Sequence, residues 1–121
     1  MFLLTQSEDY FYDHDAVKER STQQGGGSRN RRSVWSINTE PFADAHFATF
    51  PTALIVPCIQ AGSRRESTVL DPFFGSGTVG EVCLDLGRKF VGIELKQEYA
   101  EIARRRLLKR CHANIPIVTS P

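Results

Sequence analysis

The sequence predicts an α/β fold in which helices flank a parallel sheet. Two short apolar runs, at residues 68–71 and 89–95, have the length and composition of buried strands. Between them lies a glycine-rich turn, followed by a stretch ending at Gly87 whose apolar side chains recur with helical period. A strand, a helix and a second strand in this order form a βαβ unit, in which the two strands run parallel.

The elements around this unit are less sharply marked. Apolar side chains recur on one face between Tyr99 and Leu107, which predicts a further helix after the second strand. Residues 52–61 also have helical spacing, and Pro57 within them should bend or shorten that helix. The apolar runs at residues 2–5 and 33–37 predict short strands.

A length of 121 residues suits one small domain with one core. Residues 18–32 are polar and contain three consecutive glycines, which is typical of a flexible linker. We therefore expect a strand-and-turn segment at residues 1–17, a linker, and the main ligand-binding region at residues 33–121. The formal net charge of +1 gives no sign of a tail that binds polyanions.

The three cysteines, Cys58, Cys83 and Cys111, are odd in number and form no Cys-x-x-Cys pair. That pattern argues against a zinc site and against a disulfide framework, and favours reduced thiols and no bound metal. The apolar start of the chain, residues 2–4, is too short for a signal peptide or a membrane span. We therefore expect a soluble, cytoplasmic protein that does not bind membranes.

The turn has the spacing G-x-G-x-x-G, at Gly75, Gly77 and Gly80. Glycines let the backbone turn tightly and approach a ligand, and the following helix offers unpaired N–H groups at its start. Glu94 ends the second strand, where an acid can accept hydrogen bonds from two ribose hydroxyls. NAD and S-adenosylmethionine fit this pattern equally well, because both contain an adenosine.

Asp71 favours S-adenosylmethionine over NAD. It ends the first strand, four residues before Gly75. A carboxylate there would repel the pyrophosphate of NAD, whereas it would attract the ammonium and sulfonium groups of S-adenosylmethionine. The alternative is that Asp71 only caps a turn.

Residues 70–95, LDPFFGSGTVGEVCLDLGRKFVGIEL, resemble the cofactor-binding motif of the amino-group DNA methyltransferases. The likeness is to permuted members, whose cofactor motif lies near the C-terminus. Residues 32–63 resemble the segment that precedes this motif, and residues 2–17 a strand-and-turn segment of the same enzymes. The resemblance implies a partial Rossmann-like methyltransferase fold, S-adenosylmethionine as the cofactor, and methyl transfer to N6 of adenine or N4 of cytosine in DNA.

The resemblance also implies a set of cofactor-binding residues. The turn would wrap the methionine part of the cofactor, the acid would bind the ribose, and the preceding segment would close the pocket. His46, in that preceding segment, would either touch the cofactor or have a structural role. The implied residues are Thr49, Phe50, Pro51, Asp71, Pro72, Phe73, Phe74, Gly75, Ser76, Gly77, Thr78, Glu94 and Leu95.

The family performs its chemistry with a second motif, Asp/Asn/Ser-Pro-Pro followed by an aromatic residue. This motif orients the target amino group and stacks on the flipped-out base. The chain has no Pro-Pro dipeptide, so the resemblance implies no catalytic residue within it. We therefore expect the C-terminal, cofactor-binding part of a methyltransferase, inactive alone, or one subunit of a split enzyme whose other chain carries the motif.

Two other interpretations stay open. One is a nicotinamide-binding fragment of an oxidoreductase, and the other is a non-catalytic protein that binds a partner chain through an unpaired sheet edge. DNA is the partner that the resemblance implies. Arg29, Arg31 and Arg32 would either contact its phosphates or form a solvated basic linker.

Overall fold

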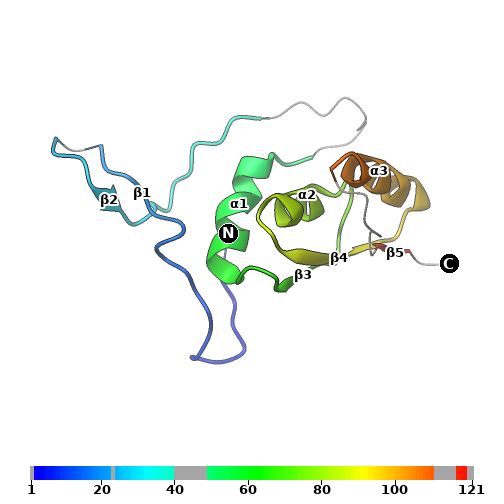
Figure 1. The fold of residues 1–121 in the computed structure, drawn as a ribbon, viewed down its shortest axis with the longest axis horizontal. Coiled ribbons are helices and arrows are strands. Elements are labelled where there is room, and N and C mark those ends of the chain that lie inside the picture. The colour runs from blue at the N-terminus through cyan, green and yellow to red at the C-terminus, as the bar shows by residue number, and fades with distance from the viewer. Residues whose placement is uncertain (1, 23, 40–48, 111–116, 120–121) are drawn as a thin grey trace.

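The structure, a computed structural model, describes residues 2–22, 24–39, 49–110 and 117–119 (Figure 1). His46 and Cys111 lie outside the described residues. The elements in chain order are β1 (Glu19–Arg20), β2 (Ser28–Arg29), α1 (Thr52–Gly62), β3 (Thr68–Asp71), α2 (Thr78–Asp85), β4 (Lys89–Glu94), α3 (Gln97–Leu108) and β5 (Ile117–Thr119).

Strands β3, β4 and β5 form a parallel sheet in that order. The βαβ unit expected from the sequence is β3–α2–β4, in which Asp71 pairs with Gly92. The predicted α/β fold with a parallel sheet and flanking helices is therefore confirmed. Because the carboxyl ends of parallel strands lie at one edge of the sheet, the ends of β3 and β4 and the turn before α2 are brought together there.

The three helices lie on the same side of the sheet (Figure 1). Along β4, Phe90 and Gly92 are buried while Lys89 and Ile93 are exposed, as expected for a strand covered on one face. None of the described helices covers the opposite face, and Leu70 of β3 is 60% exposed on it. No helix among the described residues is long and apolar enough to cross a membrane.

Phe74 is at the centre of the core. Its ring is 3% exposed and stacks on Phe90, with ring centroids 5.5 Å apart. A Cβ atom on Gly92 would lie 2.4 Å from Phe74, and one on Gly80 would lie 2.7 Å from it. Both glycines are therefore required by close packing of α2 on the sheet. The other buried core residues are Ile59, Val82, Cys83, Ala103 and Leu107.

Pro57 is buried inside α1 and does not end the helix, which runs to Gly62, one residue beyond its predicted end. The strands predicted at residues 2–5 and 33–37 are wrong, since neither segment is a strand. A strand needs a neighbour that completes its hydrogen bonds, and these two segments pair with no strand among the described residues. Strand β5, by contrast, was not predicted from its three residues.

The glycine-rich segment contains the two-residue antiparallel pair β1–β2, where the sequence predicted a flexible linker. The proposed division into segments at residues 17 and 32 stays a prediction.

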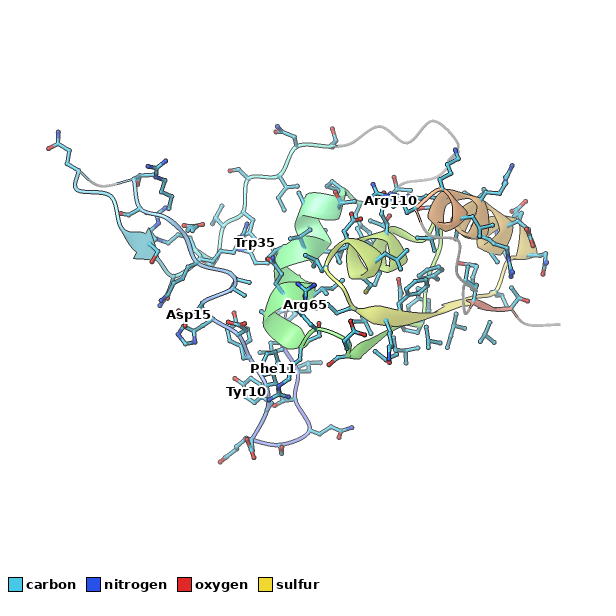
Figure 2. The ribbon with its side chains drawn as sticks, in the orientation of Figure 1. Tyr10, Phe11, Asp15, Trp35, Arg65 and Arg110 are labelled. Atoms are coloured by element: carbon cyan, nitrogen blue, oxygen red, sulfur yellow. The ribbon has the colours of Figure 1, made fainter. Side chains whose placement is uncertain are left out.

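The N-terminal segment contacts the C-terminal end of α1: the Asp13 N–H donates to the Ala61 carbonyl at 2.9 Å. Phe11 lies beyond the same end of α1 (Figure 2), and the centroid of its ring is 4.2 Å from the guanidinium carbon of Arg64.

Candidate functional site

A cleft of about 290 Å³ opens at the carboxyl ends of β3 and β4. Three parts of the chain line it: the residues before α1, the glycine turn, and the residues between β4 and α3. Open α/β sheets bind ligands at this position. The lining residues are Thr49, Phe50, Phe73, Phe74, Gly75, Ser76, Thr78, Glu94, Leu95, Lys96 and Tyr99.

Most of the site residues predicted from the sequence meet in this cleft, but four do not line it. Asp71 lines a separate hollow between α1 and β3. Gly77 faces α3, because a Cβ atom there would lie 3.0 Å from the Cβ of Ala103. Pro51 and Pro72 flank the lining residues along the chain. The cofactor roles of all the predicted residues stay predictions.

Glu94 connects the end of β4 to the glycine turn. Its Oε2 accepts a hydrogen bond from the Gly75 N–H at 2.7 Å, and its Oε1 accepts one from the Lys96 N–H at 2.9 Å. Each carboxylate oxygen has a second lone pair, so Glu94 can still accept hydrogen bonds from a ligand. The sequence pattern found this acid but not its bond to the turn.

Three other amides of the turn, those of Phe73, Phe74 and Gly77, also donate to acceptors within the protein. The Phe73 N–H donates to Asp71 Oδ1 at 3.0 Å, and the Phe74 N–H to the Ile93 carbonyl at 2.9 Å. The Gly77 N–H donates to the Phe74 carbonyl at 2.9 Å. These amides therefore do not form the cradle of unpaired N–H groups that binds a phosphate.

Negative charge gathers at the strand ends instead. Partial burial raises the pKa of Asp71 above its ordinary value, and the nearby charge of Glu94 raises it further, whereas the hydrogen bond from the Phe73 amide lowers it. A carboxylate whose charged form is disfavoured in the empty protein gains from a cationic ligand. Asp71, which lines the separate hollow, is therefore suited to a cation, whereas the cleft itself contains both Glu94 and Lys96.

The rim of the cleft is apolar. Phe73 is 88% exposed and Leu95 is 78% exposed, and Phe50 also presents its ring to solvent. Exposed large apolar side chains around a concave site are typical of ligand binding. Phe74 differs from the exposed Phe73, since the Phe74 ring belongs to the core. Only the small exposed part of Phe74 lines the cleft.

Two residues of the cleft, Lys96 and Tyr99, were not predicted as site residues from the sequence. Both line the cleft, and Lys96 Nζ lies 5.0 Å from the centroid of the Tyr99 ring. They follow Glu94 closely, at the start of α3. Their position within about one helical turn of the predicted strand end is the signal that could have identified them.

An ion-pair cluster between α2 and α3 was also not predicted from the sequence. Arg106 pairs with Glu81 and donates to Ser76 and Thr78. Arg110 pairs with Glu81 at 2.6 Å and with Asp85 at 2.6 Å. A signal was present: two acids four residues apart on α2 match two arginines four residues apart near the end of α3.

The three arginines considered for DNA binding lie in the N-terminal half. Arg29 pairs with Glu19 at 2.9 Å, so its charge is partly neutralised. Arg31 lies 4.8 Å from the centroid of the Trp35 ring. Arg31 and Arg32 both line a groove of about 580 Å³ beside α1, to which Trp35 also contributes. In the described part of the chain, no cluster of three or more His, Cys, Asp or Glu side chains could hold a metal ion.

Comparison with known proteins gives consistent relatives. A family model described as DNA methylase matches residues 1–105. The Type II methyltransferase M.Cfr9I of Citrobacter freundii is 60% identical over 107 residues, which are 88% of this chain and 35% of that protein. The Type II methyltransferase M.SmaI of Serratia marcescens is 51% identical over 110 residues, which are 91% of this chain and 38% of that protein.

Among solved structures, the crystal structure of the M1.HpyAVI-SAM complex matches with a TM-score of 0.50 and 39% sequence identity. The match covers 56% of this chain and 34% of that chain. The chain thus spans about a third of the length of the relatives and the structure that it matches.

Proposed function

Since the chain belongs to the DNA methylase family, we propose that it binds S-adenosylmethionine in the cleft at the ends of β3 and β4. The bound cofactor would supply the methyl group for transfer to N6 of adenine or N4 of cytosine in DNA. The family is the one that the motif at residues 70–95 resembles, so that prediction is confirmed. The observation that carries the proposal is the position of Glu94, which lines the cleft, holds the turn through the Gly75 N–H and keeps lone pairs for the ribose hydroxyls.

The two acids at the strand ends support a cationic cofactor that reaches from the cleft to Asp71, which lines the separate hollow. Asp71 and Glu94 end neighbouring strands, and the charge of Glu94 contributes to the raised pKa of Asp71. The ammonium and sulfonium groups of S-adenosylmethionine would relieve this repulsion, whereas the pyrophosphate of NAD would add to it. The same comparison argues against the nicotinamide-binding alternative.

The remaining groups match the rest of the cofactor. Glu94 keeps lone pairs that can accept from the ribose hydroxyls. Phe50 and Leu95 offer apolar surface for the adenine ring. All the side chains proposed to bind the cofactor therefore belong to this chain.

The methyl-transfer step needs groups that these 121 residues lack, because they contain no Pro-Pro motif. We propose that the motif comes from polypeptide outside these residues, either covalently continuous or a second chain.

Two features support a further polypeptide segment packed against the sheet. Parallel sheets are normally covered on both faces, yet Leu70, Ile93 and Val118 are exposed on one face here. In addition, β3 has a described neighbour, β4, on one side only.

DNA is the proposed substrate, and we propose a cytoplasmic location, which is where DNA lies in a bacterium such as the source of M.Cfr9I. Arg31 and Arg32 are better candidates for phosphate contacts than Arg29, whose guanidinium is paired with Glu19. Replacing both by glutamine should weaken DNA binding and reduce its salt dependence. If DNA binding depends equally on salt concentration in the parent and in this variant, neither residue contacts the DNA phosphates.

The first experiment is isothermal titration of the purified chain with S-adenosylhomocysteine, the demethylated cofactor, with NAD as the control ligand. We expect saturable binding of S-adenosylhomocysteine and none of NAD. Binding of NAD alone would overturn the assignment of the cofactor.

The second experiment tests the partner. The chain is co-expressed with the part of the M.Cfr9I methyltransferase that it does not match, and the cellular DNA is digested and examined for N6-methyladenine and N4-methylcytosine by mass spectrometry. We expect one of these bases only when both polypeptides are present. Methylation by this chain alone would contradict the need for a separate Pro-Pro motif.

A further inference from the structure

We propose that Arg106 is a positioning residue that holds the glycine turn in its ligand-binding conformation. This inference rests on the proposed function of the cleft, and it adds a residue from α3 that contacts the turn without lining the cleft.

The Arg106 guanidinium donates to three acceptors at the start of α2. Its Nη1 lies 3.4 Å from the Ser76 carbonyl, 3.3 Å from Ser76 Oγ and 3.1 Å from Thr78 Oγ1. These residues flank Gly77, which has a φ of +82°. Arginine has five N–H donors in one rigid plane, so a single side chain can fix several acceptors relative to one another.

A positive charge beside the start of a helix is unfavourable unless it is neutralised, because the helix dipole is positive there. Glu81, in the first turn of α2, pairs with Arg106 through its Oε2 and is almost fully buried. Arg110 pairs with the other oxygen of Glu81 at 2.6 Å. Arg110 lies at the C-terminal end of α3, beside α2 (Figure 2). The cluster therefore holds Arg106 in a fixed orientation.

Helix α3 also touches the turn directly. Ala103, one turn before Arg106, lies where a Cβ atom on Gly77 would approach it to 3.0 Å. The turn is thus packed by Ala103 and hydrogen-bonded by Arg106 from the same helix. The conformation of the turn depends on where α3 lies.

Ser76 and Thr78 link this support to the cleft, because both line it and both accept from Arg106. Arg106 itself does not line the cleft. Its loss should therefore change ligand affinity through the shape of the turn and not through a lost contact with the ligand.

The test compares Arg106→Met with Arg110→Met. Both variants replace arginine by an unbranched apolar side chain, and both remove one partner of Glu81. Of the two arginines, only Arg106 contacts the turn. We expect both to unfold at a lower temperature. Only Arg106→Met should weaken S-adenosylhomocysteine binding, by about tenfold, which is the effect of losing one charge-assisted hydrogen bond. Arg106→Lys, which keeps the charge beside Glu81, should lie between Arg106→Met and the parent.

Amide hydrogen exchange at residues 75–78 in the unliganded protein gives a readout that needs no ligand. We expect faster exchange in Arg106→Met than in Arg110→Met at matched stability. If the parent chain binds no S-adenosylhomocysteine, the proposed function fails, and the exchange rates still decide the role of Arg106. Equal exchange and equal affinity in the two methionine variants would overturn the inference. If Arg106→Met does not fold, Arg106→Lys against Arg110→Lys makes the same comparison.

Discussion

Glu94 Oε2 accepts a hydrogen bond from the Gly75 N–H at 2.7 Å, which joins the end of β4 to a turn 19 residues earlier in the chain. The acid that the sequence assigned to a ribose therefore also holds the turn. Replacing Glu94 by alanine would leave the amides of Gly75 and Lys96 without their acceptor. We expect Glu94→Ala to lower the free energy of unfolding by about 1–3 kcal/mol and to weaken S-adenosylhomocysteine binding as well.

Thermal unfolding and titration calorimetry measure these two effects separately. Glu98→Ala is the matched control, since Glu98 is an exposed acid in the first turn of α3. Full stability together with weakened binding in Glu94→Ala would show that the bond to Gly75 contributes nothing to the fold.

Asp71→Asn removes a charge while an amide oxygen can still accept from the Phe73 N–H. The raised pKa of Asp71 means that this group stabilises the folded protein below its unfolded pKa, and that this stability is lost as pH rises through the folded pKa. At pH 7 the variant should therefore unfold at a higher temperature than the parent. It should also bind S-adenosylhomocysteine about 1–2 kcal/mol more weakly, because the ammonium group of the ligand loses its attraction to the Asp71 carboxylate.

Asp13→Asn is the control for this change, because Asp13 Oδ1 accepts from the Ala16 N–H at 3.0 Å in the same way but far from the cleft along the chain. The affinity of the parent should rise with pH through the raised pKa of Asp71, and this rise should be absent in Asp71→Asn. Identical pH profiles for the two proteins would exclude Asp71 from cation binding.

Gly77→Ala should destabilise the turn for two reasons. The φ of +82° is unfavourable for any residue with a Cβ atom, and that atom would lie 3.0 Å from the Ala103 Cβ. We expect a loss of about 1–2 kcal/mol from the backbone conformation alone, measured by urea unfolding. Gly62→Ala is the control, since nothing lies within 4 Å of the added atom. An equal change in both variants would contradict the described conformation of the turn.

Cys83 should be chemically inert in the folded protein. Its side chain is fully buried, and burial raises its pKa from 9.0 to about 11, although the charge of Arg88 lowers it in part. Iodoacetamide at pH 8.5 should therefore modify Cys83 only after unfolding. Because the folded pKa is raised, stability should fall as pH rises from 9.0 towards about 11, and Cys83→Ala should reduce that fall. Rapid modification under native conditions would show that the α2 side of the core opens.

The open face of the sheet should cause self-association. Leu70 and Val118 are exposed there at 60% and 56%, and exposed apolar patches promote contacts between molecules. Leu70→Lys should lower the sedimentation coefficient measured at high protein concentration, without lowering the unfolding temperature. Leu4→Lys, at an exposed leucine outside the sheet, is the matched control. A parent chain that is monomeric at all concentrations would contradict this expectation.

The sequence could predict the elements whose signal is local. The apolar runs at β3 and β4, the helical period of α2 and α3 and the glycine spacing between them each occupy a few adjacent residues. Strand β5 could not be predicted, because its three residues are ordered by pairing with β4, which is a contact distant in sequence. The predicted strand at residues 2–5 failed for the same reason, since an apolar run does not supply its own partner.

The sequence by itself determined the family, the βαβ unit and the residues that gather at its carboxyl edge, because those properties follow from composition and spacing along one continuous stretch. Only the tertiary structure decided what these residues touch. It turned Gly77 towards Ala103, placed the Phe74 ring in the core, joined Glu94 to Gly75 and brought Arg106 to the turn. Such contacts depend on how helices and strands pack against one another, and that packing is fixed by distances in space and not by spacing in the chain.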